Sequence, residues 1–406
     1  MSANTVKRAL LLENIHPDAT AKLAKAGYEV TTESRALDED ELIDAARGMS
    51  FLGIRSTTQV TERVLASLSD LLAVGAFCIG TNQIDLAAAA KRGVAVFNAP
   101  FSNTRSVVEL AIAEIISLGR RLPEKNAAIH EGCWDKSAKG AHEIRGRTLG
   151  IVGYGNVGTQ LSVIAEALGM RVCFYDIADK LAIGNARRCS SLAELLESAE
   201  TVTLHVDGRP DNRGIFGEEE FAAMRPRSLF LNLSRGFVVD HAALRRHIES
   251  GHIAGAAIDV FPSEPMGPGD EFVSELRGLK NVILTPHIGG STEEAQLDIS
   301  EFVSSKLLDY ATAGVTSMSV NMPAVALPSI PGTHRLIHLH RNVPGVLAAI
   351  NRVLAEHGVN VEGQLLQTRD EYGYVVTDTG TSYRGEVLAE LRAMDVTIRL
   401  RTIESP

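Results

Sequence analysis

The sequence predicts an α/β protein with two parallel-sheet domains and a small βαββαβ domain at the C-terminal end. Three observations lead to this fold class. Short apolar runs alternate with Ala/Leu-rich amphipathic segments up to about residue 286, a pattern typical of parallel sheets covered by helices. A Pro-rich stretch at 321–332 predicts an extended linker. Residues 333–406 then follow the order strand, helix, strand, strand, helix, strand, which is the ferredoxin-like pattern.

Length and composition agree with this fold and exclude several classes of protein. The chain has 406 residues, of which 45% are hydrophobic and 22% charged, so a disordered or fibrous protein is excluded. With 40 Lys and Arg against 50 Asp and Glu, the formal charge is −10, and we expect no nucleic-acid partner. No apolar run predicts a signal peptide or a membrane span. The four scattered cysteines lack metal-ligand spacing, so we expect no metal site and a reducing, cytoplasmic compartment.

The alternating segments divide into two series. The first runs from the strand in RALLLEN, at residues 8–14, to the strand in VAVFNA, at 94–99. A long helix over about 103–121 leads to the second series, which starts with a strand at 148–153. A single helix at about 292–313 is expected to return to the first series. We therefore expect a discontinuous first domain, residues 1–103 with 289–320, and a second domain at 104–288.

The second series opens with a glycine-rich loop. Gly153, Gly155 and Gly158 form G-x-G-x-x-G directly after an apolar strand and before an amphipathic helix. The first glycine permits the turn, the second allows a pyrophosphate to approach the backbone, and the third allows close packing of helix and strand. This order predicts a Rossmann domain that binds a dinucleotide. The alternative is a glycine-rich turn in an ordinary βαβ unit.

Asp176 ends the next strand of the series, in the run VCFYD. A carboxylate at this place can accept hydrogen bonds from an adenosine ribose, and it repels a 2′-phosphate. NAD is therefore the expected cofactor rather than NADP, unless Lys180 or Arg187 compensates. The alternative interpretation is an ordinary surface aspartate.

Three later strands of the series also end in charged residues. These are Arg235 in LNLSRG, Glu264 in AAIDVFPSEP and His287 in LTPHIGGS. Because the carboxyl ends of parallel strands meet at one edge, the three side chains could converge near the cofactor. A histidine acid/base, a glutamate that tunes it and an arginine that grips a carboxylate suit hydride transfer to or from a 2-hydroxy acid. Taken singly, each residue has a structural alternative, such as a helix cap for Arg235 or a solvated side chain for Glu264.

Several long motifs resemble the D-2-hydroxyacid dehydrogenase family. They are IVGYGNVG at 151–158, LNLSRGFVVD at 231–240, GAAIDVFPSEP at 255–265, LTPHIGGST at 284–292 and CIGTNQIDLAAAAKRGVAVFNAPFSNTRSV at 78–107. The resemblance covers nearly the whole chain, and is strongest to the members that oxidise 3-phospho-D-glycerate. It implies a flavodoxin-like substrate domain, a Rossmann NAD domain and a C-terminal ACT domain. It also implies an NAD-dependent oxidoreductase that forms 3-phosphohydroxypyruvate in the first step of L-serine synthesis.

The resemblance carries site residues over to this sequence. Arg235, Glu264 and His287 are the implied catalytic set. The implied cofactor-binding residues are Gly153, Tyr154, Gly155, Asn156, Val157, Gly158, Asp176, His205, Leu233, Ser234, Arg235, Asp259, His287, Ile288, Gly289 and Gly290. The implied substrate contacts are Arg55, Ser56, Gly80 and Asn103. Some relatives carry a second arginine where this chain has Thr57, so backbone amides or Lys136 could complete the phosphate pocket. A solvated surface charge is an equal alternative for Lys136.

The C-terminal domain resembles an ACT domain, a small module that binds amino acids. His338, His340 and Asn342 share one face if their segment is extended. The residues that match His340, Asn342 and Asn360 bind serine between two ACT domains in serine-inhibited relatives. L-serine is therefore the expected effector, and paired contacts of the ACT and nucleotide domains imply a homotetramer. The alternative is a domain that only dimerises.

Two other functions stay open at this point. Relatives also act on 2-hydroxyglutarate and 2-oxoglutarate, so the substrate could be another 2-hydroxy acid. Some family members act as co-repressors that sense NADH, although a complete catalytic set and an amino-acid module speak against that function here.

Overall fold

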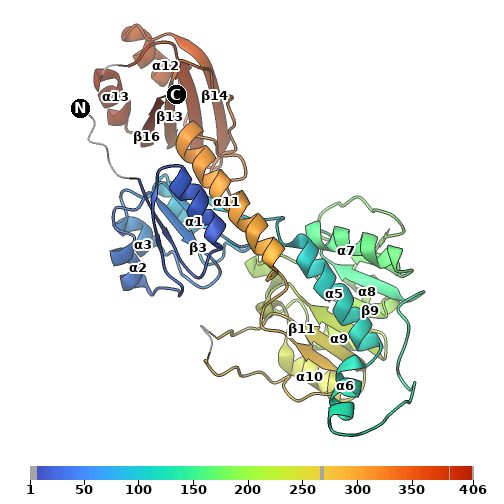
Figure 1. The fold of residues 1–406 in the computed structure, drawn as a ribbon. Coiled ribbons are helices and arrows are strands. Elements are labelled where there is room, and N and C mark those ends of the chain that lie inside the picture. Colours follow the sequence, from blue (N-terminus) through green and yellow to red (C-terminus); the bar gives the residue numbers. More distant parts are fainter. Residues whose placement is uncertain (1–6, 266–268, 384, 405–406) are drawn as a thin grey trace. The chain divides into compact units, whose positions relative to one another are not determined.

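The computed structural model describes residues 7–265, 269–383 and 385–404. The chain divides into two compact units, Met1–Pro100 with Gln296–Pro406, and Phe101–Ala295 (Figure 1). We call them the terminal unit and the central unit. None of the predicted site residues falls outside the described ranges. The sequence predicts three domains, whereas the structure divides the chain into two units, so the borders between the three domains stay a prediction.

A parallel five-stranded sheet forms the first part of the terminal unit. Its order is β2-β1-β3-β4-β5, which confirms the flavodoxin-like prediction. The strands are β1 (Arg8–Leu11), β2 (Glu29–Thr32), β3 (Phe51–Ile54), β4 (Ala73–Ala76) and β5 (Ala95–Asn98). The helices that follow them are α1 (Pro17–Lys25), α2 (Glu39–Ala45), α3 (Glu62–Ser67) and α4 (Leu86–Lys91). Asp38, Thr61 and Asp85 start α2, α3 and α4, because each side chain accepts a backbone N–H of the first turn.

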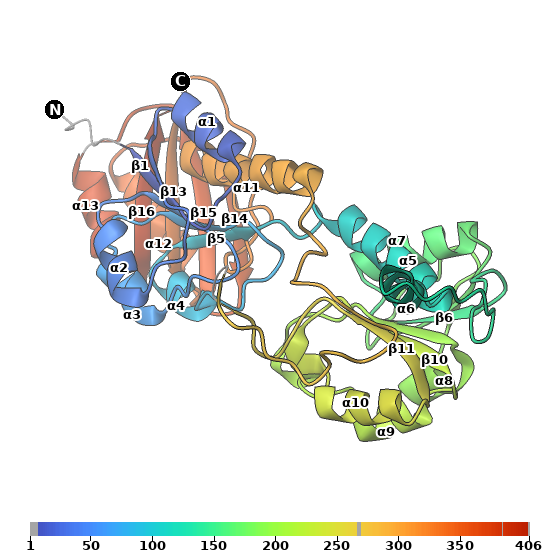
Figure 2. The same ribbon diagram turned by 60° about the horizontal axis from the view of Figure 1, so that its bottom comes forward.

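The long helix α11 (Glu293–Ala313) covers one face of this sheet. Val303 and Leu307 are fully buried in the same cluster as Phe51 of β3. α1 lies beside α11, where Lys22 binds Glu301 and Ser305 (Figures 1 and 2). The helix therefore packs on the sheet of the first series, as predicted.

The C-terminal domain has a four-stranded antiparallel sheet in the order β14-β15-β13-β16. Its elements are β13 (His334–Arg341), α12 (Val346–Glu356), β14 (Val361–Arg369), β15 (Tyr372–Thr379), α13 (Gly385–Ala393) and β16 (Thr397–Glu404). This βαββαβ arrangement confirms the predicted ferredoxin-like fold. Within the terminal unit it packs on the parallel-sheet part, because Arg399 donates to the carbonyls of Leu71 and Gly93.

The central unit has a seven-stranded parallel sheet in the order β12-β11-β10-β9-β6-β7-β8. The strands are β6 (Thr148–Val152), β7 (Arg171–Tyr175), β8 (Arg187–Arg188), β9 (Thr201–Leu204), β10 (Ser228–Asn232), β11 (Ile253–Ile258) and β12 (Val282–Leu284). Apart from the added β12, the order is that of a Rossmann sheet, as predicted. Two short 3₁₀ turns, η1 (Pro210–Asn212) and η2 (Gly236–Val238), lie in its loops.

Helices cover both faces of the central sheet (Figure 1). α5 (Thr104–Gly119) and α7 (Asn156–Ala167) pack side by side over one buried cluster. α8 (Leu192–Ser198), α9 (Glu218–Ala223) and α10 (His241–Glu249) bury a second cluster on the other face. Because helices cover both faces of the sheet, a ligand can reach polar groups of the sheet at the strand ends.

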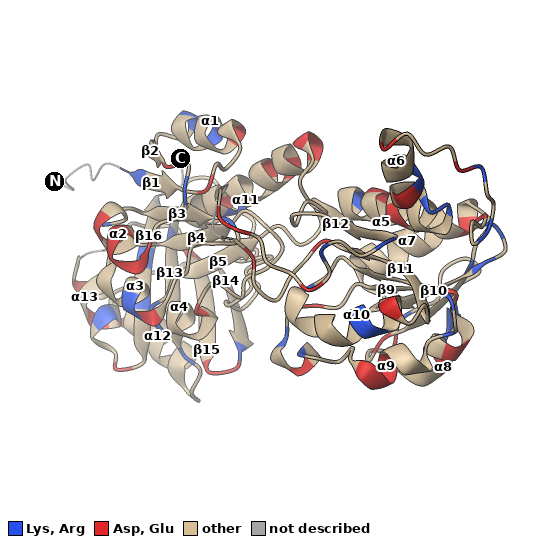
Figure 3. Cartoon of the chain, turned by 90° about the horizontal axis from the view of Figure 1, so that it is seen from below, with Lys and Arg blue, Asp and Glu red and all other residues tan. Residues whose placement is uncertain are grey.

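One helix of the central unit lies outside this layered core. α6 (Leu122–His130) follows α5 and contributes no buried residue. It leads into residues 131–143, most of which are exposed. Acidic and basic residues are interspersed over the helices and loops (Figure 3). In the described part of the chain, we find no helix with the length and apolar character needed to cross a membrane.

Candidate active site

The glycine loop after β6 lies at the carboxyl edge of the central sheet. Gly153 has φ 92°, and a Cβ there would lie 2.6 Å from the His205 carbonyl oxygen. A Cβ on Gly158 would lie 2.3 Å from the Gly153 oxygen, whereas one on Gly155 would meet nothing within 4 Å. The loop is therefore tightly packed against its own sheet and open at Gly155. This is the shape that a pyrophosphate needs, with the N-terminal amides of α7 beside it, so these residues fit an NAD cofactor.

Asp176 follows β7, at the predicted ribose position. Its two carboxylate oxygens accept the N–H groups of Tyr154 and Ala178, each at 2.8 Å. Each oxygen keeps a lone pair for a ribose hydroxyl. Arg187, which could have favoured a 2′-phosphate, instead pairs with Glu194. The local charges therefore suit NAD better than NADP.

Two of the predicted cofactor residues have buried rings. The Tyr154 ring stacks on Phe174 with centroids 3.8 Å apart, and its hydroxyl bonds to Ser162. Only the backbone of Tyr154 can therefore face the cofactor. The His205 ring lies 3.0 Å from the Thr203 hydroxyl, and burial lowers the pKa of His205 to about 4. A neutral His205 adds no charge beneath the loop.

His287 and Glu264 form the predicted acid/base pair. Nδ1 of His287 lies 2.9 Å from Oε2 of Glu264, whose other oxygen accepts the Phe261 N–H at 3.0 Å. The hydrogen bond to Glu264 raises the pKa of His287 above its ordinary value, against the effect of desolvation. Burial raises the pKa of Glu264, but the hydrogen bond and the charge of His287 outweigh it, so the net shift is downward. The pair leaves Nε2 of His287 for proton transfer.

Arg235 follows β10 and completes the set within the same unit. Its Nη1 donates to the Ser234 carbonyl at 2.7 Å. Arg235 occupies the N-cap position of η2, but its side chain makes no capping hydrogen bond there, so the structure does not support the helix-cap alternative. Its positive charge is close enough to lower the pKa values of both Glu264 and His287. The structure thus brings together all three predicted catalytic residues.

Asp259 fixes the loop that carries His287. This carboxylate is 2% exposed, and it accepts the Thr285 hydroxyl at 2.7 Å and the N–H groups of Ile288 and Gly289 at 2.8 Å. His287 itself has φ 54°, a left-handed conformation that a side chain rarely adopts. The sequence predicts Asp259 only as a cofactor contact. The structure adds the second role of holding a strained loop.

The remaining cofactor residues line the same edge. Leu233 and Ser234 are almost fully buried, and the Ser234 hydroxyl donates to Asn232 at 2.8 Å. Asn156 and Val157 begin α7, and Ile288 is 41% exposed. A Cβ on Gly290 would lie 2.2 Å from the side chain of Asn103. Asn103, a predicted substrate contact, therefore belongs to the central unit, beside the His287 loop.

A buried acid that the sequence prediction missed lies beneath this loop. Glu114 of α5 is 3% exposed, and neither of its carboxyl oxygens has a partner among the described residues. Burial raises the pKa of Glu114 to about 8, and the negative charge of Asp259 adds to the shift. Glu114 is therefore mostly protonated at neutral pH, so only Asp259 carries charge there.

The predicted substrate residues Arg55, Ser56 and Gly80 lie at the carboxyl edge of the terminal unit's parallel sheet. Gln83 joins their two loops, because its Nε2 donates to the carbonyls of Arg55 at 2.6 Å and Gly80 at 3.2 Å. The Arg55 guanidinium has no hydrogen bond or ion pair to any residue that the structure describes. This part of the loop therefore presents a free cation.

Glu13 is the functional residue that sequence reasoning missed in this unit. Its carboxylate accepts the N–H groups of Arg55 at 3.2 Å, Thr57 at 3.0 Å and Thr58 at 2.9 Å. Glu13 has φ 62°, so its backbone is strained to aim the carboxylate. Backbone amides were one expectation for the phosphate pocket. Glu13 occupies these three, and the expectation stays a prediction for the remaining amides. The sequence signal was a glutamate directly after the strand RALLL.

Lys136 belongs to a different environment from this loop. It lies in the exposed 131–143 segment of the central unit, with Nζ 5.7 Å from the centre of the Trp134 ring. Among the described residues Lys136 has no hydrogen bond or ion pair, and its part in the phosphate pocket stays a prediction.

The predicted effector residues lie at two ends of the C-terminal sheet. His340 and Asn342 are at the end of β13, whereas Asn360 precedes β14, whose first residue is aligned through Thr379 with His334 at the start of β13. His338 and His340 are almost fully buried on one face of β13, with ring centroids 5.7 Å apart. Burial lowers the pKa of both rings, and His340 Nε2 has no partner among the described residues. Asn342 follows the end of β13 and donates to the Asp370 carbonyl, while Asn360 precedes β14 and donates to Glu362. The two asparagines are thus exposed, and the histidines are not.

Comparisons with known proteins agree with this geometry. The NAD-binding domain of D-isomer specific 2-hydroxyacid dehydrogenases matches residues 112–289, and an ACT domain like that of the AHAS small subunit matches residues 336–399. The D-3-phosphoglycerate dehydrogenase of Haemophilus influenzae is 48% identical over 395 residues, covering 97% of this chain and 96% of the relative. Its counterpart in Escherichia coli K12 is 49% identical, with 97% of each chain covered.

Solved structures show the same fold. The TT0316 protein from Thermus thermophilus has a TM-score of 0.69 at 29% identity, covering 75% of this chain and 96% of that one. A D-lactate dehydrogenase from Aquifex aeolicus has a TM-score of 0.67 at 24% identity, covering 75% and 95%, and shows the fold alone. Fold, site and sequence agree, and the chain belongs to the D-isomer specific 2-hydroxyacid dehydrogenase family, among the D-3-phosphoglycerate dehydrogenases that end in an ACT domain.

Proposed function

We propose that this protein oxidises 3-phospho-D-glycerate to 3-phosphohydroxypyruvate with NAD, the first step of L-serine synthesis. The observation that carries the proposal is the His287–Glu264 hydrogen bond beside Arg235, at the edge of an NAD-binding sheet. The names of the relatives that are nearly half identical over the full length support the substrate. The cofactor supplies the hydride acceptor, and the residues of the chain do the remaining work.

Each catalytic residue has one task in this reaction. Nε2 of His287 accepts the proton of the C2 hydroxyl as the hydride leaves, and returns it during reduction. Glu264 holds Nδ1, which fixes the tautomer and stabilises the imidazolium that forms. Arg235 binds the substrate carboxylate with its planar guanidinium and polarises the C2 oxygen.

The phosphate of the substrate requires a cation at its far end. Arg55 is suited to this role, because its guanidinium is unpaired in the described structure and its loop is fixed by Glu13. Ser56 adds a hydroxyl and its backbone N–H. This is the one N–H of residues 55–58 that Glu13 does not accept. Thr57 leaves the loop with a single arginine, which is why 2-oxoglutarate belongs in the substrate test.

A substrate panel tests the proposal. Purified protein should consume NADH most efficiently with phosphohydroxypyruvate, with kcat/KM at least about tenfold above that for 2-oxoglutarate and for unphosphorylated hydroxypyruvate. No turnover of phosphohydroxypyruvate at any accessible pH would exclude this function. A preference for 2-oxoglutarate would keep the reaction class and change the substrate.

We further propose that L-serine inhibits the enzyme through the C-terminal domain. The family match to an ACT domain supports an amino-acid effector, and the unpartnered Nε2 of the buried His340 offers it a polar group next to Asn342. The full chain should lose activity as serine is added. The His340→Ala variant should keep its basal activity and lose this response, and an unchanged response would place the effector site elsewhere.

Three further proposals rest on analogy with the family. We propose a homotetramer built from nucleotide-domain and ACT-domain contacts, which light scattering of the full chain would test. The domain borders at 103/104, 288/289 and 320/321, with a linker to 332, are proposals that limited proteolysis would test. The four cysteines, all in the described ranges, form no disulfide, which supports a reducing, cytoplasmic location.

A further inference from the structure

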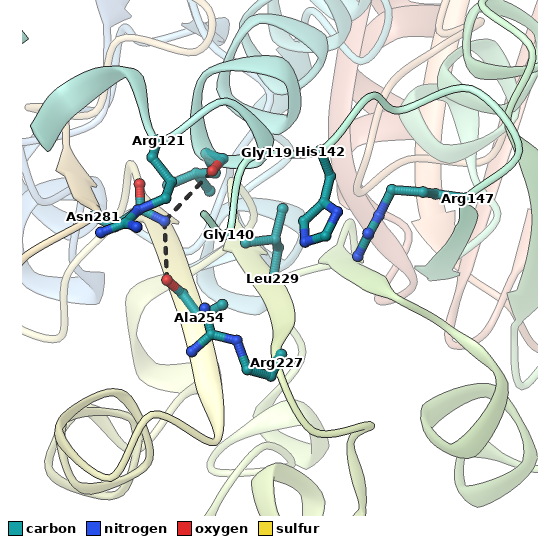
Figure 4. Close-up of a pocket in the computed structure, with 10 residues that line it drawn as sticks. Gly119, Arg121, Gly140, His142, Arg147, Arg227, Leu229, Ala254 and Asn281 are labelled. Atoms are coloured by element: carbon teal, nitrogen blue, oxygen red, sulfur yellow. Dashed lines mark hydrogen bonds between the residues drawn. The ribbon is translucent and has the colours of Figure 1, made fainter. Parts of the chain in front are cut away.

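A second pocket of the central unit lies at the opposite edge of its sheet from the NAD loop. It is formed where β6, β10, β11 and β12 begin, under the end of α5 and the exposed 131–143 segment. Three arginines, Arg121, Arg147 and Arg227, approach it together with His142 and Gly140 (Figure 4). The pocket is partly open to solvent, and its cavity volume is about 20 Å³, which is enough for one or two oxygen atoms of a ligand.

Two of these arginines have an unusual backbone. Arg121 has φ 54° and Arg227 has φ 66°, so both are in the left-handed region that favours glycine. A long side chain at such a position is less stable than glycine would be. Two strained arginines at one small pocket suggest that their side chains, rather than their backbones, are what the site requires.

The guanidinium groups of these two arginines meet over a glycine. Arg121 Nη1 lies 3.4 Å, and Arg227 Nη2 lies 3.5 Å, from the position that a Cβ would take on Gly140. Gly140 has φ 74°, so its own conformation also favours glycine. The 131–143 segment thus passes the pocket at Gly140, where the missing side chain leaves room for the guanidinium groups of Arg121 and Arg227.

The charges around the pocket are only partly balanced. Arg121 pairs with Glu124 and donates to the Lys139 carbonyl at 2.8 Å, and Arg147 lies 3.6 Å from Glu200. The Arg227 guanidinium has neither a hydrogen bond nor an ion pair to any residue in the described ranges. Arg227 is exposed, and its positive charge lies near a second guanidinium without a carboxylate of its own. An anion would relieve that repulsion and accept the unused donors.

We propose that this pocket binds a phosphate-sized oxoanion. One or two of its oxygens would enter the pocket and accept hydrogen bonds from Arg227 and Arg121, and the remainder would lie at the mouth, near Arg147 and His142. The ligand chemistry is a phosphoryl group, which either inorganic phosphate or a phosphorylated metabolite could supply. The site is separate from the proposed substrate phosphate at Arg55, which belongs to the terminal unit.

Equilibrium dialysis with radiolabelled inorganic phosphate tests the proposal. The full chain is saturated with NADH to exclude phosphate from the NAD loop, and the ionic strength is kept constant with chloride. An Arg55→Ala background removes the proposed substrate site. We expect about one phosphate per chain in that background, and its loss on the further change Arg227→Asn, which removes the charge and retains a residue that tolerates the left-handed backbone.

Three matched variants make the result specific. Arg225→Asn removes another exposed arginine, which does not line the pocket, and should retain the phosphate. Arg227→Lys should retain it with weaker affinity. If Arg227→Asn fails to fold, Arg121→Gly removes the other cation at a backbone that glycine prefers. Absence of phosphate binding in the Arg55→Ala background would overturn the proposal, and so would binding that survives Arg227→Asn, or Arg121→Gly where Arg227→Asn does not fold. In the NADH-saturated Arg55→Ala protein, displacement of the bound phosphate by 3-phosphoglycerate would indicate a phosphorylated metabolite as the source, and no displacement would indicate inorganic phosphate.

Discussion

The terminal and central units each use one carboxylate to hold a functional loop, but the two loops present different chemistry. In the central unit Asp259 takes two backbone amides and a hydroxyl, and the loop it holds carries His287, already paired with Glu264. In the terminal unit Glu13 takes three amides, and the loop it holds carries Arg55, which is unpaired in the described structure. The reacting groups are therefore assembled within one unit, and the other offers an open cation. Variants of the two units should consequently differ in which kinetic constant they change.

The largest effect is expected for His287→Asn in the central unit. Loss of the acid/base should lower kcat by about 10³-fold or more, at the upper end of what general acid/base catalysis contributes. NADH affinity, measured by fluorescence titration, should change little. His130→Asn, on the exposed helix α6, is the matched control and should remain active. A His287→Asn enzyme with normal turnover would remove this residue from the mechanism.

Glu114→Gln tests the buried acid beneath the Asp259 loop. Because the pKa of Glu114 is raised to about 8, the folded protein retains a proton that the unfolded chain loses near pH 4.5. The wild type should therefore lose stability as pH rises from about 4.5 to 8, by up to about 5 kcal/mol from this group.

The variant should lack this part of the pH dependence. Urea unfolding at pH 5 and pH 8.5 measures it as the difference between wild type and Glu114→Gln. Glu109→Gln, on an exposed face of the same helix, should follow the wild type. Parallel curves for wild type and Glu114→Gln would show that Glu114 ionises normally.

Asp259→Asn should loosen the central loop. A displaced His287 is expected to lower kcat by about 10²-fold, since misplacement of a reacting group by about 1 Å has an effect of this size. The KM for phosphohydroxypyruvate should change less than kcat. If instead only the NADH affinity fell, Asp259 would be a cofactor contact and not a support for the loop.

Glu13→Gln is the corresponding change in the terminal unit. The amide cannot accept all three backbone N–H groups with its single oxygen, so the Arg55 loop should move and the KM of the phosphorylated substrate should rise roughly tenfold. The kcat should stay within about threefold of wild type. Glu62→Gln, an exposed glutamate of α3, is the control. A fall in kcat at unchanged KM would remove the contrast between the two units.

The sequence could predict those parts of the fold and of the site whose residues are close together along the chain. The glycine loop and Asp176 follow their strands directly, and the three catalytic residues lie three to six residues past the ends of β10, β11 and β12. Both parallel sheets and the βαββαβ domain belong to the predicted classes. Strand ends converge at one edge whatever the details of packing, so adjacency along the chain is sufficient there.

Other roles depend on contacts between segments that are distant in sequence. Glu13 reaches a loop more than forty residues away, and Glu114 acquires its raised pKa only through burial beside Asp259. The left-handed backbones of Arg121 and Arg227 run against local preference, since glycine is the usual residue there. Strand alternation indicated one face for His338 and His340, but not that this face is buried.

The pH dependence of the Glu264→Gln variant tests most directly whether the central unit alone prepares the acid/base. Because the bond to Glu264 raises the pKa of His287, the imidazolium needed for reduction persists to higher pH in the wild type. In phosphohydroxypyruvate reduction, the basic limb of kcat/KM should therefore move to lower pH in Glu264→Gln. An unchanged basic limb in this variant would contradict the account.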